Sequence, residues 1–236
     1  MTNLLAIDTA TDACSVALLH AGEVTERYEV VPRRHNQRLQ SMLQELLGQG
    51  DLRGLGIEAI AYGAGPGSFT GLRIAAAAVQ GLAFSNSLPA VPVSTLAAQA
   101  LTAARLGHVE MTQPVLSLID ARIGEVYWAV FEFVDGLPTM TQGPGVSRPA
   151  EIPDLAAGTP LAAVGDGCAL VTDMPSGLQE RIAIAAPELL PAARDILPLA
   201  QRGLEAGHAQ RAQDVAPVYV RDEISWKKLA EQGKAK

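Results

Sequence analysis

The residues best suited to chemistry lie in a glycine-rich stretch, residues 65–73, that reads Gly-Pro-Gly-Ser-Phe-Thr-Gly-Leu-Arg. An apolar segment at 57–62 precedes it and an alanine-rich run follows, which predicts a strand, a tight turn and a helix. Gly65 and Gly67 permit positive φ and close backbone approach, and Ser68 can accept from the first helical N–H groups. Because a helix start favours negative charge, the stretch is compatible with phosphate binding. It is equally compatible with a tight corner that lets another segment come close.

Asp8 is the second candidate, because it ends a short apolar run and precedes a threonine-rich turn. In the actin-like ATPase and sugar-kinase fold, an acid at this position holds a hydrated Mg²⁺ while turn N–H groups contact phosphate. The alternative is that Asp8 caps its own turn. Nucleotide loops usually have glycine two residues after the acid, and Ala10 stands there, which favours capping. The possible nucleotide or phosphate contacts are Asp8, Thr9, Gly65, Gly67 and Ser68.

Histidine, serine, carboxylate and cysteine residues do not occur at the spacings that catalytic or metal sites require. No two of the four histidines are close enough in sequence to place two metal ligands on one helix face. No Gly-x-Ser-x-Gly turn and no carboxylate pair suited to acid–base chemistry stands out. Cys14 and Cys168 are far apart and are expected to be reduced thiols. We therefore predict no catalytic residue and no metal site.

Composition limits the kind of core and the classes of function that this chain can have. The 236 residues are 48% hydrophobic but only 4% aromatic, so we expect an aliphatic core. The net charge of −7 and the small basic clusters argue against a broad nucleic-acid surface. No apolar run reaches the roughly 20 residues that span a bilayer, and no positive charge precedes the first apolar residues as in a signal peptide. We expect a cytoplasmic protein that does not enter a membrane.

The spacing of apolar residues predicts the elements that position these residues. The first half predicts three strands joined by tight turns, an antiparallel meander, and then alternating helices and strands that extend it with parallel strands. We expect strands at 4–8, 15–19, 24–31, 57–62 and 90–93, and helices at 34–47, 68–84 and 94–105.

The second half predicts fewer and looser elements. A charged stretch at 105–113 suggests a boundary, and five prolines predict that 135–160 is largely loop. We expect strands at 115–119, 125–134, 161–164 and 182–185, a short helix after 167, helices at 192–205 and 222–232, and an extended segment at 215–220. We predict a first lobe over 1–106 and a smaller, more irregular second lobe over 107–221. A C-terminal helix within 222–236 could return to the first lobe.

Two helical stripes could form either a core or an interface. The first comprises Leu39, Met42, Leu43 and Leu46, and the second comprises Gly71, Ala75, Ala78 and Leu82. Both helices could bury these stripes against the sheet, which is the commoner use of such a pattern. Small residues also let helices of two subunits approach closely, so the stripes could form half of a four-helix interface.

Ordered motifs over nearly the whole length resemble those of the TsaB (YeaZ) family, bacterial accessory proteins in the synthesis of N6-threonylcarbamoyladenosine (t6A) in tRNA. The matching stretches are 4–11, 65–73 with the following helix, 93–96, 119–122, 125–127, 165–167 and 217–221. Each stretch is weak alone, whereas the set in this order and spacing is specific.

The resemblance implies the α/β fold of the actin-like ATPase (ASKHA) superfamily, with two RNase H-like lobes of mixed sheets flanked by helices. It also implies a non-catalytic partner that binds and activates the paralogous TsaD transferase, which threonylcarbamoylates adenosine 37 of tRNA. TsaD holds a metal through two histidines in an Asn-His-x-x-x-His segment. Thr95 and Gln99 stand at these positions here, and neither is a good transition-metal ligand.

The resemblance further implies a heterodimer with TsaD through the helices at 34–47 and 68–84, and a homodimer through the same helices when the chain is alone. TsaE, a small ATPase, would join a ternary complex, and tRNA contact would be indirect. We expect no cofactor on this subunit, with ATP or ADP possible at the complex interface. The alternative function is an ATP-binding phosphotransferase or ATPase, with nucleotide held by Asp8, the glycine-rich loop and 165–167.

Overall fold

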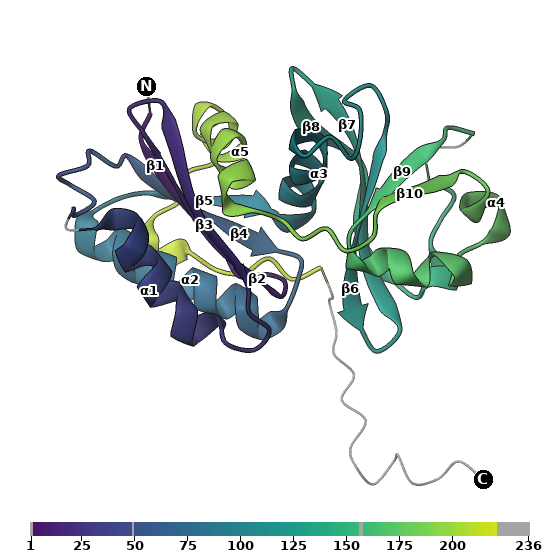
Figure 1. The fold of residues 1–236 in the computed structure, drawn as a ribbon, viewed down its shortest axis with the longest axis horizontal. Helices are drawn as coiled ribbons and strands as arrows, with labels where there is room; N and C mark the ends of the chain where they lie inside the picture. The colour runs from purple at the N-terminus through teal and green to yellow at the C-terminus, as the bar shows by residue number, and fades with distance from the viewer. Residues whose placement is uncertain (1, 49, 156–157, 221–236) are drawn as a thin grey trace, which may run out of the picture.

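The computed structural model describes residues 2–48, 50–155 and 158–220. It shows two five-stranded sheets side by side, with helices on their outer faces and between them (Figure 1). None of the described helices combines the length and apolar character that crossing a membrane requires.

The first sheet begins with the predicted antiparallel meander. It comprises β1 (Leu4–Asp8), β2 (Ala13–His20), β3 (Glu23–Val30), β4 (Ala59–Gly65) and β5 (Ala90–Ser94), in the order β3-β2-β1-β4-β5. Strand β4 pairs parallel to β1, and β5 pairs parallel to β4, so alternation with helices does extend the meander as predicted. The strand expected at 57–62 lies slightly later, because it continues into the glycine-rich turn.

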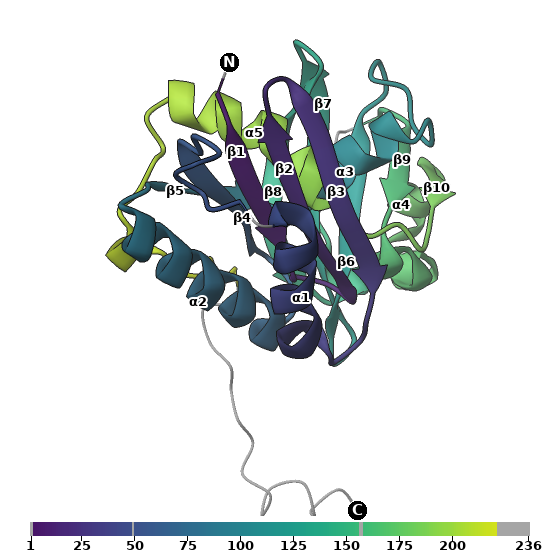
Figure 2. The same ribbon diagram turned by 60° about the vertical axis from the view of Figure 1, so that its left-hand side comes forward.

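Helices cover both faces of this sheet. Helices α1 (His35–Leu47) and α2 (Phe69–Asn86) pack on one face, while α3 (Thr95–Arg105) and α5 (Ala193–Glu205) lie between the two sheets (Figures 1 and 2). The start of α2 is capped by Ser68, whose hydroxyl accepts from the Gly71 N–H at 3.3 Å.

The second sheet repeats the topology of the first. It comprises β6 (Val115–Arg122), β7 (Glu125–Val134), β8 (Leu137–Ser147), β9 (Leu161–Val164) and β10 (Ile182–Ala186), in the order β10-β9-β6-β7-β8. Again an antiparallel meander is extended by two parallel strands. This correspondence confirms the predicted class of two related lobes with mixed sheets flanked by helices.

The prediction that 135–160 is largely loop is wrong, because β8 occupies much of it. This strand forms an edge of the second sheet, where a missing N–H does not interrupt a ladder, so Pro138 and Pro144 are tolerated. Its pairing with β7 also carries two register shifts. The remaining short elements are η1 (Pro149–Glu151), η2 (Asp166–Asp173), α4 (Ser176–Gln179) and η3 (Ala212–Asp214).

The chain after β10 returns to the first sheet. Helix α5 packs on β1, β2, β4 and β5, the Gln210 N–H donates to the Ala90 carbonyl, and the Val218 N–H donates to the Ala64 carbonyl. The boundary near residue 106 remains a prediction, but part of the range assigned to the second lobe lies against the first. The terminal helix predicted at 222–232 is outside the described residues.

Hydrogen bonds at the N-terminus of α5 hold the chain after β10 against the first sheet. The helix has no side-chain cap of its own, and residues of the first sheet accept from its free N–H groups instead. The Ser15 hydroxyl accepts from the Ala193 N–H at 2.8 Å, and the Glu26 carboxylate accepts from the Arg194 N–H at 3.1 Å. These bonds fix α5 on β2 and β3.

A buried carboxylate then joins α5 to α3. Asp195 is 3% exposed and accepts from the Thr102 hydroxyl at 2.7 Å and from the Arg105 guanidinium at 2.8 Å. Its place in the first turn of α5 also stabilises the helix, because the N-terminus favours negative charge. Both helices of the central layer therefore depend on Asp195.

We predict that Asp195→Ala lowers the free energy of unfolding by about 2–4 kcal/mol, because Arg105 and Thr102 lose their shared acceptor. Urea denaturation measures the change. Glu205→Ala, an exposed position in the last turn of the same helix, is the control and should change stability little. Equal effects of the two substitutions would contradict the assigned role of Asp195.

Candidate functional site

Asp8 is a buried carboxyl at the end of β1. It is fully buried, and its Oδ1 accepts from the Ala10 N–H at 3.0 Å, which is the turn-capping arrangement. Its Oδ2 has no described partner, and neither has the buried hydroxyl of Thr95. Both atoms face Gly63, where a Cβ would lie 1.9 Å from Asp8 Oδ2 and 3.6 Å from Thr95 Oγ1. Glycine at 63 is therefore needed to make room for the carboxyl.

Burial changes the chemistry of Asp8. It raises the pKa of this carboxyl from 3.8 to about 7, against the opposing effect of the hydrogen bond from Ala10. At neutral pH the carboxyl is therefore close to half protonated, unlike a permanent anion that would hold a hydrated Mg²⁺.

The glycine-rich loop is a tight corner around the β1–β2 turn. The Ser68 N–H donates to the Ala10 carbonyl at 2.7 Å, and a Cβ on Gly67 would lie 2.4 Å from that same oxygen. A Cβ on Gly71 would lie 1.9 Å from the Thr9 carbonyl, and the Thr9 hydroxyl donates to the Gly71 carbonyl at 2.7 Å. The close approach of the chain's own backbone therefore accounts for both glycines.

Gly65 likewise allows a close backbone approach, in this case of the C-terminal segment near Val218. Its φ is +127°, and a Cβ there would lie 2.5 Å from the Val218 carbonyl. The Ser68 and Gly71 N–H groups, which a phosphate would need, already donate to Ala10 and to the Ser68 hydroxyl. Two N–H groups at this helix start are therefore engaged within the chain, and contact of the loop with a nucleotide or phosphate stays a prediction.

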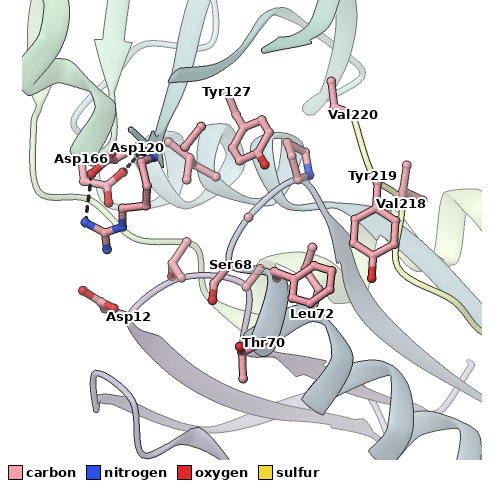
Figure 3. Close-up of a pocket in the computed structure, with 18 residues that line it drawn as sticks. Asp12, Ser68, Thr70, Leu72, Asp120, Tyr127, Asp166, Val218, Tyr219 and Val220 are labelled. Atoms are coloured by element: carbon pink, nitrogen blue, oxygen red, sulfur yellow. Dashed lines mark hydrogen bonds and ion pairs between the residues drawn. The ribbon is translucent and has the colours of Figure 1, made fainter. Parts of the chain in front are cut away.

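A cavity of about 710 Å³ lies between the lobes, beside this corner but not including Asp8. In Figure 3 the carboxylates of Asp12, Asp120 and Asp166 gather on one side, and Tyr127 and Tyr219 lie toward the other. Its walls come from the β1–β2 turn, the start of α2, the β6–β7 hairpin and the C-terminal segment. We call this space the interlobe cavity.

The charged residues that line the interlobe cavity are three aspartates and one arginine. The Arg122 guanidinium lies 2.9 Å from the Asp120 carboxylate, and Asp166 accepts from the Asp120 N–H at 2.9 Å. Burial raises the pKa of Asp166. Within the described part of the chain, neither Asp12 nor Asp166 forms an ion pair. The same part contains no cluster of three His, Cys, Asp or Glu side chains that could hold a metal.

Most residues of the predicted interface stripes are buried within the chain, and their use in an interface stays a prediction. Five members are buried under α1 and α2 within the chain: Leu39, Met42, Leu46, Gly71 and Ala75. The other three are only partly buried: Leu43, Ala78 and Leu82. The exposed face of α2 instead presents Ala77, Gly81 and Phe84, the last 74% exposed. These three residues are spaced by four and three, so they lie on one side of the helix.

Thr95 and Gln99 lie one turn apart on α3, and both are fully buried. The Gln99 amide is engaged at both ends, donating to the Leu189 carbonyl at 2.8 Å and accepting from the Ser117 hydroxyl at 2.6 Å. The pair therefore offers a hydroxyl and a hydrogen-bonded amide, which bind transition metals weakly compared with imidazole.

We predict that Asp8→Asn raises the free energy of unfolding by about 1–3 kcal/mol at pH 8. Between pH 4 and 7 the folded chain binds a proton on Asp8 that the unfolded chain has released, because the folded pKa is about 7. The wild type should therefore lose stability as pH rises through that window, relative to the variant. Asparagine still accepts from Ala10 but carries no charge.

Urea titrations at pH 5 and pH 8 measure this difference. Asp173→Asn, at an exposed aspartate in η2, is the control for removal of a carboxylate. A wild type whose stability relative to Asp8→Asn does not change between the two pH values would contradict the assignment.

Comparison with known proteins identifies the family. The family model for TsaD, tRNA N6-adenosine threonylcarbamoyltransferase, matches residues 23–228. The chain is 39% identical over 230 residues to the tRNA threonylcarbamoyladenosine biosynthesis protein TsaB of Escherichia coli K12, covering 96% of this chain and 97% of that protein. The TsaB protein of Haemophilus influenzae is 36% identical over 236 residues, with 96% of each chain covered.

The fold comparison agrees. The structure of YeaZ from Pseudomonas aeruginosa superposes with a TM-score of 0.84 at 40% identity, covering 93% of this chain and 100% of that one. The predicted actin-like ATPase fold class is thereby confirmed together with the motif-based identification. The chain belongs to the TsaB (YeaZ) family, within the wider group that the TsaD family model describes.

Proposed function

We propose that this chain is a non-catalytic partner that binds and activates a TsaD transferase in the threonylcarbamoylation of tRNA adenosine 37. Relatives at 36–39% identity over almost the full length are named as t6A biosynthesis proteins, which supports this role over an independent phosphotransferase. The corner at Ser68 and Ala10 adds support, because the Ser68 and Gly71 N–H groups at the helix start already donate within the chain.

The observation that carries the non-catalytic role is the chemistry of Thr95 and Gln99. A transferase that positions its substrate through a metal needs strong ligands one helical turn apart. Here the Gln99 amide is committed to Ser117 and Leu189, so it stabilises the junction of α3 with the second sheet. We infer that catalysis resides in TsaD and that this chain binds no cofactor, with any ATP or ADP at the complex interface.

The surface we propose for TsaD is the outer face of α1 and α2. These helices pack side by side on the first sheet (Figure 2). The small exposed residues of α2, Ala77 and Gly81, allow a helix of a second chain to approach closely. We assign Leu43, Ala78 and Leu82 to this face, together with Ala77, Gly81 and Phe84. The homodimer would use the same face, while TsaE would join the heterodimer in the cytoplasm and tRNA contact would be made mainly by TsaD.

Reconstitution tests the function directly. TsaD, a supply of threonylcarbamoyl adenylate, TsaE with ATP, and unmodified tRNA are combined with and without this chain. We expect co-purification with TsaD and t6A formation only when the chain is present, whereas the chain alone should neither modify tRNA nor hydrolyse ATP. Turnover by the purified chain alone would overturn the proposal.

We predict that Gly81→Glu weakens binding to TsaD by about tenfold or more, because it places a charge in an apolar helix interface. A Cβ on Gly81 meets nothing within 4 Å, so the free chain should fold normally. Isothermal titration with TsaD measures the affinity, and analytical ultracentrifugation should show that the homodimer is lost as well.

Gly177→Glu in α4 is the matched control, because it also introduces glutamate at an exposed helical glycine with open space, but on the second lobe. The assignment of the face fails if Gly81→Glu binds TsaD as tightly as this control. Substitution of Ala75 would be uninformative, because that residue is fully buried and its replacement would unfold the chain.

A further inference from the structure

Uncharged side chains dominate the outer face of α1 and α2 (Figure 2). On α2 no residue after Arg73 is charged. The exposed residues of α1 are amides and a single acid: Asn36, Gln37, Gln40, Gln44 and Glu45. The cores of protein interfaces are depleted of charged residues in the same way. Because each chain has a net charge of −7, two copies approach most easily through a face without charge.

The two charged residues of α1, Arg38 and Glu45, lie on the side of the helix that faces β3. The Arg38 guanidinium donates to the Glu29 carboxylate at 2.7 Å and to the Glu45 carboxylate at 2.8 Å. Glu45 also lies 3.9 Å from the Arg27 guanidinium. Since Arg27 and Glu29 belong to β3, the charges of α1 are paired beside the outer face and do not project from its centre.

Gln37, Gln40 and Gln44 form one ridge along α1, which we call the amide ridge. Their spacing of three and four residues places them on one side of the helix, opposite the buried Met42 and Leu46. The ridge is nearly symmetrical about its middle residue, because its ends lie about 4.5 Å before and about 6 Å after it along the helix axis. An amide both donates and accepts, so the ridge can pair with an identical ridge, whereas like charges repel each other.

We propose that the amide ridge packs on the amide ridge of a second copy of this chain, with the two α1 helices antiparallel. In a two-fold dimer the same patch of each chain meets itself. Gln37 then lies opposite Gln44 of the second copy, and Gln40 lies near the two-fold axis. Polar pairs in a helical interface fix its register, so these amides select this arrangement. The inference rests on the proposed use of this face in the homodimer and adds the residues that determine its register.

Charge substitutions in the amide ridge test the pairing on the full chain. Gln37→Glu with Gln44→Glu places two pairs of like charges across the interface, so the dissociation constant of the dimer should rise about tenfold or more. Gln37→Glu with Gln44→Lys places opposite charges in both pairs and should restore the dimer, with an affinity that falls at high salt. Analytical ultracentrifugation measures both constants. Since both positions are exposed and the new residues are good helix formers, the fold should be retained, which circular dichroism checks.

Thr172→Glu with Ser176→Glu is the control, because it adds the same charge at exposed positions of the second lobe and should leave the dimer unchanged. The inference is overturned if the double-glutamate ridge variant dimerises like this control. It is also overturned if the Glu/Lys ridge variant stays as monomeric as the double-glutamate variant, which parallel α1 helices would produce. Loss of TsaD binding without loss of the dimer would assign the ridge to TsaD instead.

Gly81→Glu separates this inference from the proposed function. A dimer that Gly81→Glu dissociates but the ridge variants leave intact retains the proposed face and rejects the pairing of the amide ridges. A wild type that is monomeric at every concentration, or a dimer that none of these variants dissociates, rejects both the homodimer through this face and the pairing.

Discussion

The backbone contact between the β1–β2 turn and the start of α2 is the constraint on which the rest of this architecture depends. The Ser68 N–H donates to the Ala10 carbonyl at 2.7 Å, and glycine at positions 67 and 71 allows this approach. The Ala10 carbonyl thereby engages one of the N–H groups at the start of the helix. The same turn and helix start form one wall of the interlobe cavity.

Beyond that corner, the molecule consists of a central helical layer, which we call the frame, and two separate surfaces. In the frame, side chains of the first sheet cap α5, and Asp195 of α5 binds α3. One surface is the outer face of α1 and α2, where α1 exposes polar side chains and α2 exposes Ala77, Gly81 and Phe84. The other is the interlobe cavity, whose lining includes three carboxylates and two tyrosines. Their different chemistry suits different binding events, and the shared frame keeps their geometry constant.

Much of this frame could be predicted from the sequence, because it depends on local signals. Alternating apolar residues predicted the meander, and Ser68 predicted the start of α2. Strand β8 was missed because Pro138 and Pro144 are evidence against a strand unless its position at a sheet edge is known. The core role of Ala75 was equally hidden, because a helical stripe does not reveal whether a sheet or a partner covers it. The sequence analysis grouped the glycine-rich loop with residues 165–167, and Gly67, Ser68 and Asp166 do line the interlobe cavity. Asp8 does not line it, and Tyr127 and Tyr219 do, which only the tertiary structure could show.

The composition of the outer face explains how one surface can remain exposed in the free chain and still bind a partner. Alanine and glycine at 77 and 81 expose little apolar area, so their contact with water costs little free energy. The large exposed apolar side chains of α2 are Phe84, 74% exposed, and Phe69 at the start of the helix, 48% exposed. In the complex that we propose, the same absence of side chains at 77 and 81 would let a second helix approach α2 closely, and affinity would come from close packing on this preformed face.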